Sequence, residues 1–173
     1  MKNFLFVLSL SLITILGFSQ ESTTAVRKIP GVSVMDVNGH KINTADISNN
    51  GKPVIISFWA TWCKPCISEL TAINEVYSDW QKETGVKLIA VSIDDARSSP
   101  KVLPLVNAKA WDYEVLLDQN GDFKRALNVN AVPHTFLING NGEIVWQHTS
   151  FIEGNELELI DLVRKLEAGL PLN

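Results

Sequence analysis

Apolar residues are arranged in two patterns along the chain, and together they predict strands that alternate with helices. Unbroken apolar runs at 53–60 and 86–93 are typical of buried parallel strands. Between them, from Ile67 to Trp80, apolar residues recur at helical spacing. This stretch predicts an amphipathic helix over about residues 63–84, closed by the glycine that follows it.

The flanking segments extend this order. A small hairpin is predicted over 32–42, with a type I′ turn at Asn38-Gly39. Pro104 would break a helix begun near Ser98, so the next helix is placed later. The remaining expected elements are a helix at 102–110, a strand at 113–117, a helix at 122–127, strands at 134–138 and 143–148, and a helix at 153–168.

This order predicts an α/β domain with a central mixed sheet flanked by helices. Strands that alternate with helices pair in parallel and carry helices on both faces, and the late hairpin adds antiparallel strands. A chain of 173 residues suffices for one such domain with a sizeable core.

The first residues differ from the rest in composition. Residues 1–19 join a lysine-bearing start to an apolar stretch and end in small residues, which predicts a secretory signal cleaved before Gln20. The alternative is an uncleaved anchor, although the apolar run is shorter than a membrane span requires. Residues 20–30 are expected to form a flexible leader, and 31–173 the folded domain.

Charge narrows the classes of partner. Cleavage would leave 14 basic and 19 acidic residues, a net charge of −5. Such a balance argues against nucleic acid and against an anionic membrane surface as binding partners.

The two cysteines of the chain, Cys63 and Cys66, stand in a C-x-x-C spacing where the first buried strand gives way to the helix. The first turn of a helix has unpaired N–H groups and the positive end of the dipole, which stabilise a thiolate. The thiolate is the nucleophile of disulfide exchange, so this position predicts a reactive pair.

Three other interpretations of the pair were weighed. The pair could be half of a zinc site, but zinc usually needs four ligands, and His40, His134 and His148 are too widely scattered in the sequence to form a ligand motif. A purely structural disulfide would close a very small loop and stabilise little. Inert core thiols fit poorly at a junction of a loop and a helix. The sequence therefore points to redox chemistry at the cysteines, without metal or cofactor.

Two motifs together resemble thioredoxin: Trp-Cys-Lys-Pro-Cys at 62–66, after a buried strand, and Ala-Val-Pro-His-Thr-Phe-Leu-Ile at 131–138. The form Phe-Trp-Ala-Thr-Trp-Cys-x-Pro-Cys, the secretion signal and the N-terminal hairpin are more similar to the exported TlpA/ResA-type branch. The resemblance covers roughly residues 30–170.

The resemblance implies roles for matching positions. Cys63 would be the solvent-facing nucleophile and Cys66 the resolving thiol, and the two would form the redox disulfide. Pro133 would be the family's cis-proline beside that disulfide. Trp62 and Val132 would lie at the substrate-docking surface.

The chain departs from thioredoxin in the acid that serves proton transfer. Thioredoxin carries a buried aspartate where this chain has Ser57. By position in ResA-like proteins, Asp95 or Glu69 is expected to accept the proton of Cys66 instead. The alternatives are that Asp94 and Asp95 cap the next segment in solvent, and that Glu69 is a solvated acid of the first helical turn.

His134 is the second departure, since the family usually has threonine after the proline. A histidine there is expected at the docking surface, where a charge near neutral pH would stabilise a Cys63 thiolate. The alternative is that it points away along the strand.

These observations predict an exported, periplasmic or extracytoplasmic thiol–disulfide oxidoreductase. The resemblance favours a monomeric reductase of exported proteins that bear disulfides, with apocytochrome c as a possible substrate, recharged by a membrane electron donor of the DsbD/CcdA kind. The competing hypotheses are a thioredoxin-fold binding or assembly module with a vestigial cysteine pair, and a thiol peroxidase.

Overall fold

A computed structural model describes residues 26–172. The predicted signal at 1–19 lies outside the described residues, as does most of the predicted leader at 20–30. Among the described residues, no helix combines the length and the apolar character that crossing a membrane would require.

The strands form one mixed sheet, as predicted, in the order β2-β1-β5-β4-β3-β6-β7. β3, β4 and β5 pair in parallel, whereas β1, β2, β6 and β7 pair with their neighbours in antiparallel fashion. The strands are β1 (Ser33–Asp36), β2 (Lys41–Asn43), β3 (Val54–Trp59), β4 (Lys87–Ser92), β5 (Glu114–Leu117), β6 (His134–Ile138) and β7 (Ile144–Thr149).

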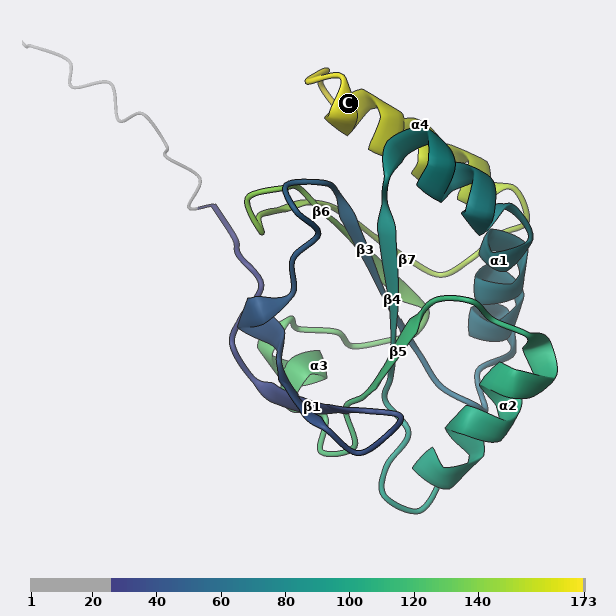
Figure 1. Ribbon diagram of the computed structural model, residues 1–173. Coiled ribbons are helices and arrows are strands. Elements are labelled where there is room, and N and C mark those ends of the chain that lie inside the picture. Colours follow the sequence, from purple (N-terminus) through teal and green to yellow (C-terminus); the bar gives the residue numbers. More distant parts are fainter. Residues whose placement is uncertain (1–25, 173) are drawn as a thin grey trace, which may run out of the picture.

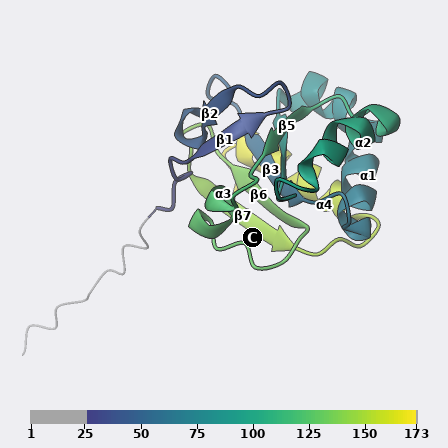
Figure 2. The same ribbon diagram turned by 90° about the horizontal axis from the view of Figure 1, so that it is seen from below.

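Helices cover both faces of the sheet. Three long helices pack on one face and a short one on the other, beside the N-terminal hairpin (Figures 1 and 2). The helices are α1 (Lys64–Thr84), α2 (Val102–Lys109), α3 (Asp122–Ala126) and α4 (Asn155–Glu167), with short 3-10 turns at Thr44–Asp46 and Ser99–Lys101.

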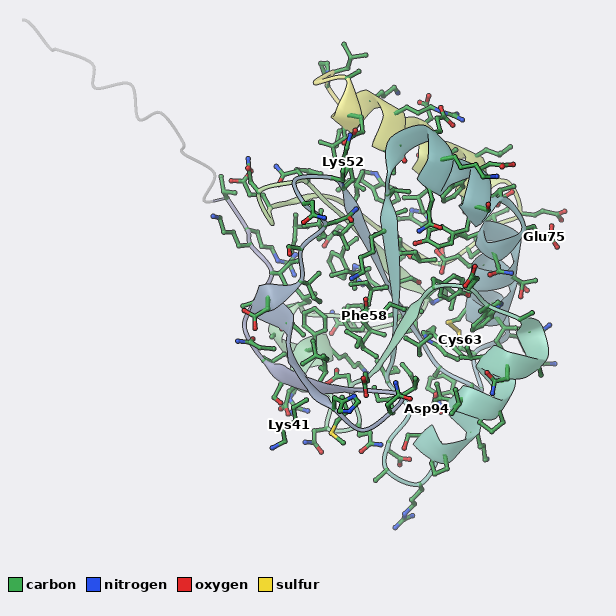
Figure 3. All side chains as sticks on the ribbon, viewed as in Figure 1. Lys41, Lys52, Phe58, Cys63, Glu75 and Asp94 are labelled. Atoms are coloured by element: carbon green, nitrogen blue, oxygen red, sulfur yellow. A yellow bond between two sulfur atoms is a disulfide. The ribbon has the colours of Figure 1, made fainter. Side chains whose placement is uncertain are left out.

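β3 lies at the centre of the domain and is buried on both faces, which explains its unbroken apolar sequence. Ile55 and Trp59 face α1 and α4, whereas Phe58 faces α3. The Phe58 ring packs against Phe123 and Phe136 at centroid distances of 5.2 and 5.9 Å. In Figure 3, Phe58 and Cys63 lie on opposite sides of the sheet.

The prediction of a type I′ turn in the N-terminal hairpin is wrong. That turn needs positive φ at both central residues, but of Asn38 and Gly39 only the glycine has it, at 86°. The Asp36 carboxylate sets the geometry instead, because it accepts the N–H groups of Asn38 and His40, each at 2.8 Å.

Pro104 lies inside α2 without breaking it. The 3-10 turn at Ser99–Lys101 leads into the helix, so Pro104 falls in the first turn, where a missing N–H is tolerated.

Residues 26–30 have defined partners, although the sequence assigned them to a flexible leader. The N–H of Ile144 donates to the carbonyl of Arg27 at 2.8 Å, and Lys28 forms a bridge with Glu143. The guanidinium of Arg27 lies 5.6 Å from the ring centroid of Phe136. The folded part of the chain therefore begins before residue 31.

The turn between β6 and β7 supplies a test of the packing. A Cβ on Gly140 would overlap the backbone carbonyl of Gly51, in the loop that precedes β3. Gly140→Ala should therefore lower the free energy of unfolding by about 1–3 kcal/mol, the usual effect of overpacking. Asn141→Ala, in the same turn but exposed, should change it by less than about 0.5 kcal/mol. Equal stability of both variants in urea denaturation would contradict this packing.

Candidate active site

Cys63 and Cys66 are joined by a disulfide at the N-terminus of α1, directly after β3. Cys63 is the N-cap of the helix, and its Sγ accepts the N–H of Cys66 at 3.3 Å. The side chain of Cys63 keeps 5% of its surface exposed, whereas Cys66 is completely buried. Only Cys63 is thus placed to meet an incoming sulfur atom.

The helix start favours negative charge on Cys63 once the disulfide is opened. The first turn of α1 contains no acidic residue, and Pro65 lies there without an N–H to leave unpaired. The exposed Lys64 adds a positive charge. Helix dipole and N–H groups together stabilise a thiolate at this cap.

Asp94 fixes the loop that carries the cysteines. This buried carboxylate accepts the N–H of Thr61 at 2.8 Å and its hydroxyl at 2.7 Å, and also the hydroxyl of Ser92 at 2.8 Å. The loop after β3 is thereby tied to the end of β4. The sequence did not predict this link, since it offered Asp94 as a solvent-exposed cap or as a less favoured proton acceptor than Asp95 and Glu69.

The segment before β6 forms the other wall of the site. The Val132–Pro133 peptide bond is cis, and the carbonyl oxygen of Val132 lies 3.7 Å from the Sγ of Cys63. Trp62 is 65% exposed beside the disulfide. An apolar side chain and a backbone carbonyl thus flank the sulfur of Cys63.

Glu69 lies one helical turn after Cys66, on the same buried face of α1. Its carboxylate accepts the hydroxyl of Thr135 at 2.8 Å on one oxygen and that of Ser57 at 3.1 Å on the other. Ser57 and Thr135 are register partners on β3 and β6, so both hydroxyls rise from the sheet beneath the helix. The carboxyl therefore lies beside Ser57, the position at which the resemblance implies an aspartate in thioredoxin.

Burial makes Glu69 an acid that titrates near neutral pH. Desolvation raises its pKa from 4.5 to about 7, and the hydrogen bonds from Thr135 and Ser57 offset only part of this rise. Within residues 26–172, no lysine or arginine forms an ion pair with it. A group with this pKa can take up or release a proton at neutral pH.

The expectation for Asp95 is not supported by its position. Its side chain is exposed, and its carboxylate accepts the N–H groups of Arg97 and Ser98 at 3.0 and 2.9 Å and the Ser98 hydroxyl at 2.8 Å. These hydrogen bonds lower its pKa, so it holds a proton less readily than a free aspartate. Asp95 caps its own turn, which was the alternative considered from the sequence.

The functional expectation for His134 is also overturned. Its ring lies on the opposite face of the sheet from α1 and stacks on Phe136, with ring centroids 4.4 Å apart and planes 11° apart. Burial lowers the pKa of His134 and favours the neutral ring. A buried neutral imidazole on that face cannot supply the charge expected beside Cys63.

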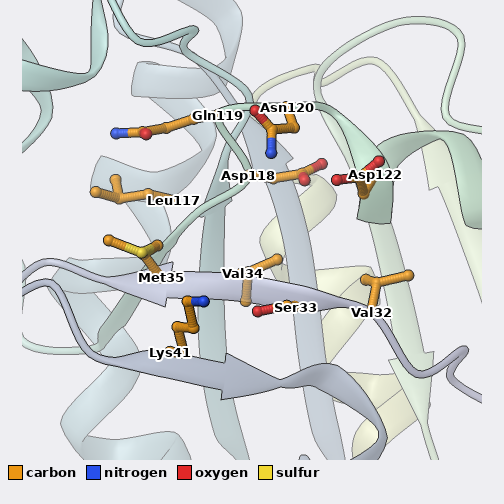
Figure 4. A pocket seen from close by; sticks show the side chains of 10 residues that line it. All are labelled: Val32, Ser33, Val34, Met35, Lys41, Leu117, Asp118, Gln119, Asn120 and Asp122. Carbon is orange, nitrogen blue, oxygen red and sulfur yellow. The ribbon is translucent and has the colours of Figure 1, made fainter.

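A separate groove of about 550 Å³ lies between β1 and the loop that joins β5 to α3 (Figure 4). It contains neither cysteine nor Glu69. Asp118 on its wall already caps α3, since it accepts the N–H groups of Phe123 and Lys124 at 3.1 and 2.8 Å. Nowhere in residues 26–172 do three or more potential ligands cluster to hold a metal ion.

Residues 25–147 match the AhpC/TSA family. The thiol-disulfide oxidoreductase ResA of Geobacillus kaustophilus is 33% identical over 155 residues, which span 89% of this chain and 83% of its own. The chain belongs to this thioredoxin-like family. It is a thiol–disulfide oxidoreductase, and the disulfide between Cys63 and Cys66 supplies the redox group.

Solved structures agree with this assignment. An uncharacterized thioredoxin-like protein of Porphyromonas gingivalis is 56% identical with a TM-score of 0.73, covering 81% of this chain and 92% of that one. A putative thiol:disulfide interchange protein DsbE of Chlorobium tepidum is 25% identical with a TM-score of 0.68, covering 79% and 94%. The α/β thioredoxin-like fold predicted from the sequence is thereby confirmed.

The raised pKa of Glu69 predicts how stability depends on pH. Between the unfolded value of about 4.5 and the folded value of about 7, the folded protein keeps a proton that the unfolded chain has released. The free energy of unfolding should therefore fall by about 3 kcal/mol as the pH rises through this window.

Glu69→Gln should remove this fall in urea denaturation of the oxidised protein, because glutamine does not titrate. Glu75→Gln, at an exposed acid of the same helix, should retain it. Parallel pH curves for wild type and Glu69→Gln would show that Glu69 keeps an ordinary pKa.

Proposed function

We propose that the protein is an exported reductase that transfers electrons from its cysteine pair to disulfides of other exported proteins. One observation carries this proposal: a C-x-x-C pair at a helix N-terminus has a buried carboxyl of pKa about 7 one turn away. Relatives named ResA support the chemistry. The signal pattern at 1–19 supports export.

Reduction would proceed in two exchanges. The Cys63 thiolate attacks one sulfur of the substrate disulfide, that bond breaks, and the first substrate thiolate leaves. Cys66 then gives its S–H proton to Glu69 and attacks the Sγ of Cys63. The mixed disulfide breaks, the second substrate thiolate leaves, and two electrons have passed from the cysteine pair to the substrate.

Each residue around the disulfide has a proposed part in this sequence. Trp62 and Val132 form the surface that receives the substrate chain, and the cis bond before Pro133 shapes it. Glu69 is a suitable proton acceptor because its two oxygens are held by hydroxyls, not by a cation that would keep it ionised.

Partners follow from the chemistry. The substrates are thiol- or disulfide-bearing exported proteins, with the cysteines of an apocytochrome c as a specific candidate. Each turnover leaves the pair oxidised, so a membrane electron donor of the DsbD/CcdA kind would restore the dithiol. The protein would act as a periplasmic or extracytoplasmic monomer.

Serine variants test the two thiol roles. Cys63→Ser should abolish reduction of insulin disulfides, because no nucleophile meets the substrate. Cys66→Ser should accumulate a mixed disulfide through Cys63, visible as a mass adduct that dithiothreitol removes. Full activity in both variants would contradict this proposal. Absence of insulin reduction by the wild type would indicate a vestigial pair, and peroxide consumption dependent on Cys63 would indicate a thiol peroxidase.

Glu69→Gln should slow the release of that mixed disulfide by about 10²-fold or more near neutral pH, the usual contribution of a positioned proton acceptor. Formation of the mixed disulfide should stay unchanged, because that step uses the Cys63 thiolate. Stopped-flow measurement of the two steps, with Glu75→Gln as the matched control, separates them. Unchanged release in Glu69→Gln would remove Glu69 from the mechanism.

The reduction potential of the Cys63–Cys66 disulfide at neutral pH determines whether the protein reduces or oxidises its substrates. A value near or below about −250 mV makes the dithiol a strong donor and fits the reductase. A value between about −120 and −180 mV would mean that the protein oxidises or isomerises its substrates.

A further inference from the structure

A row of polar side chains crosses the apolar sheet face beneath α1 and α4. Thr135 on β6 is the register partner of Ser57 on β3 and of His148 on β7, so the three side chains share one face. Elsewhere on this face Leu137 pairs with Trp146, which is the apolar pattern expected there. The polar row runs from the carboxyl of Glu69 to the edge strand of the sheet.

A small cavity connects the two ends of this row. Glu69, Thr135 and His148 line it, together with Asn155 and Glu156 of α4. Apolar side chains form most of its wall, those of Ile73, Trp146, Phe151 and Leu159. Its volume is about 10 Å³, close to what one water molecule needs, and Glu69, Thr135 and His148 are the polar groups with which a water there could form hydrogen bonds.

His148 has a buried ring nitrogen that lacks a hydrogen-bond partner. Its Nε2 is inaccessible to solvent and has no hydrogen-bond partner within residues 26–172. Its ring stacks on Trp146, with centroids 5.7 Å apart and planes 7° apart, which fixes its orientation. An unpaired buried nitrogen destabilises the fold, and a hydrogen bond to one water in the cavity would offset this destabilisation.

The other titratable side chains near Glu69 already form hydrogen bonds elsewhere. Glu156 accepts the N–H of Gly154 at 3.0 Å, and the hydroxyl of Tyr113 donates to the carbonyl of Leu70 at 3.2 Å. Burial, and then the charge of Glu69, raise the pKa of Tyr113, so it keeps its proton. β3 and β6 contribute only hydroxyls beneath the carboxyl.

We propose that His148 exchanges the proton of Glu69 with solvent, through the Thr135 hydroxyl and one water in the cavity. Histidine suits this task because an imidazole ring can accept a proton on one nitrogen and release one from the other. The proposal rests on the proton-accepting role proposed for Glu69, through which His148 acts.

The proton balance of the step is simple. Glu69 passes the proton from Cys66 to the Thr135 hydroxyl, which gives its own proton to the water. The water then gives one to Nε2 of His148, and Nδ1 of the ring releases one to bulk water. No electron moves, and one proton leaves the protein for each one accepted. The route ends at β7, the edge strand of the sheet.

Proton exchange at Glu69 can be followed directly. A pH jump from about 6 to about 8 spans the pKa of Glu69, and time-resolved infrared absorption reports the loss of the protonated carboxyl band. If this band is absent from Glu69→Gln, it belongs to the carboxyl of Glu69. His148→Phe keeps the ring stack and removes both nitrogens, and it should slow the loss of the band about tenfold or more.

Two further variants separate proton transfer from structure. His148→Gln can hydrogen-bond the water without titrating, and it should be as slow as His148→Phe. His40→Phe, at an exposed histidine of the hairpin, should match wild type.

A wild-type rate in His148→Phe or in His148→Gln would overturn the relay while leaving the role of Glu69 intact. A wild-type protein without a carboxyl band that titrates near pH 7 would overturn both.

Discussion

The active site depends on one buried carboxyl. Glu69 is held between α1 and the sheet by two hydroxyls and without a cation, so the folded protein favours its protonated form. Glu69, whose ionised form destabilises the fold, thus lies one helical turn after Cys66. A pKa of about 7 fits the proton-accepting role proposed for it at the pH where disulfide exchange takes place.

The remainder of the site holds the sulfur atoms in a fixed relation to this carboxyl. Asp94 ties the loop before Cys63 to β4, the N-terminus of α1 favours a thiolate on Cys63, and the segment at Val132 closes the opposite wall. The sheet orders these parts, because β3, β4 and β6 are neighbours at its centre. Groups from three separate stretches of sequence therefore form the site: the loop and helix at 61–69, Asp94 after β4, and the segment at Val132.

The sequence predicted most of the fold, because apolar periodicity and glycine or proline stops mark the strands and helices of this chain well. It also located the cysteine pair and the wall at Pro133. It favoured Asp95 as proton acceptor, because Asp94 and Asp95 both follow β4 and only the folded structure shows that Asp95 is exposed and Asp94 bonded to Thr61. His134 was misplaced for a similar reason, because a strand presents alternate residues to opposite faces.

The pH dependence of the reduction potential tests the central claim, that Glu69 and the cysteine pair exchange a proton, most directly. A group whose pKa differs between the oxidised and reduced proteins changes the slope of potential against pH by about 30 mV per unit. The account predicts such a break near the pKa of about 7 in wild type and its absence in Glu69→Gln. The same break in both proteins, or none in wild type, would contradict it.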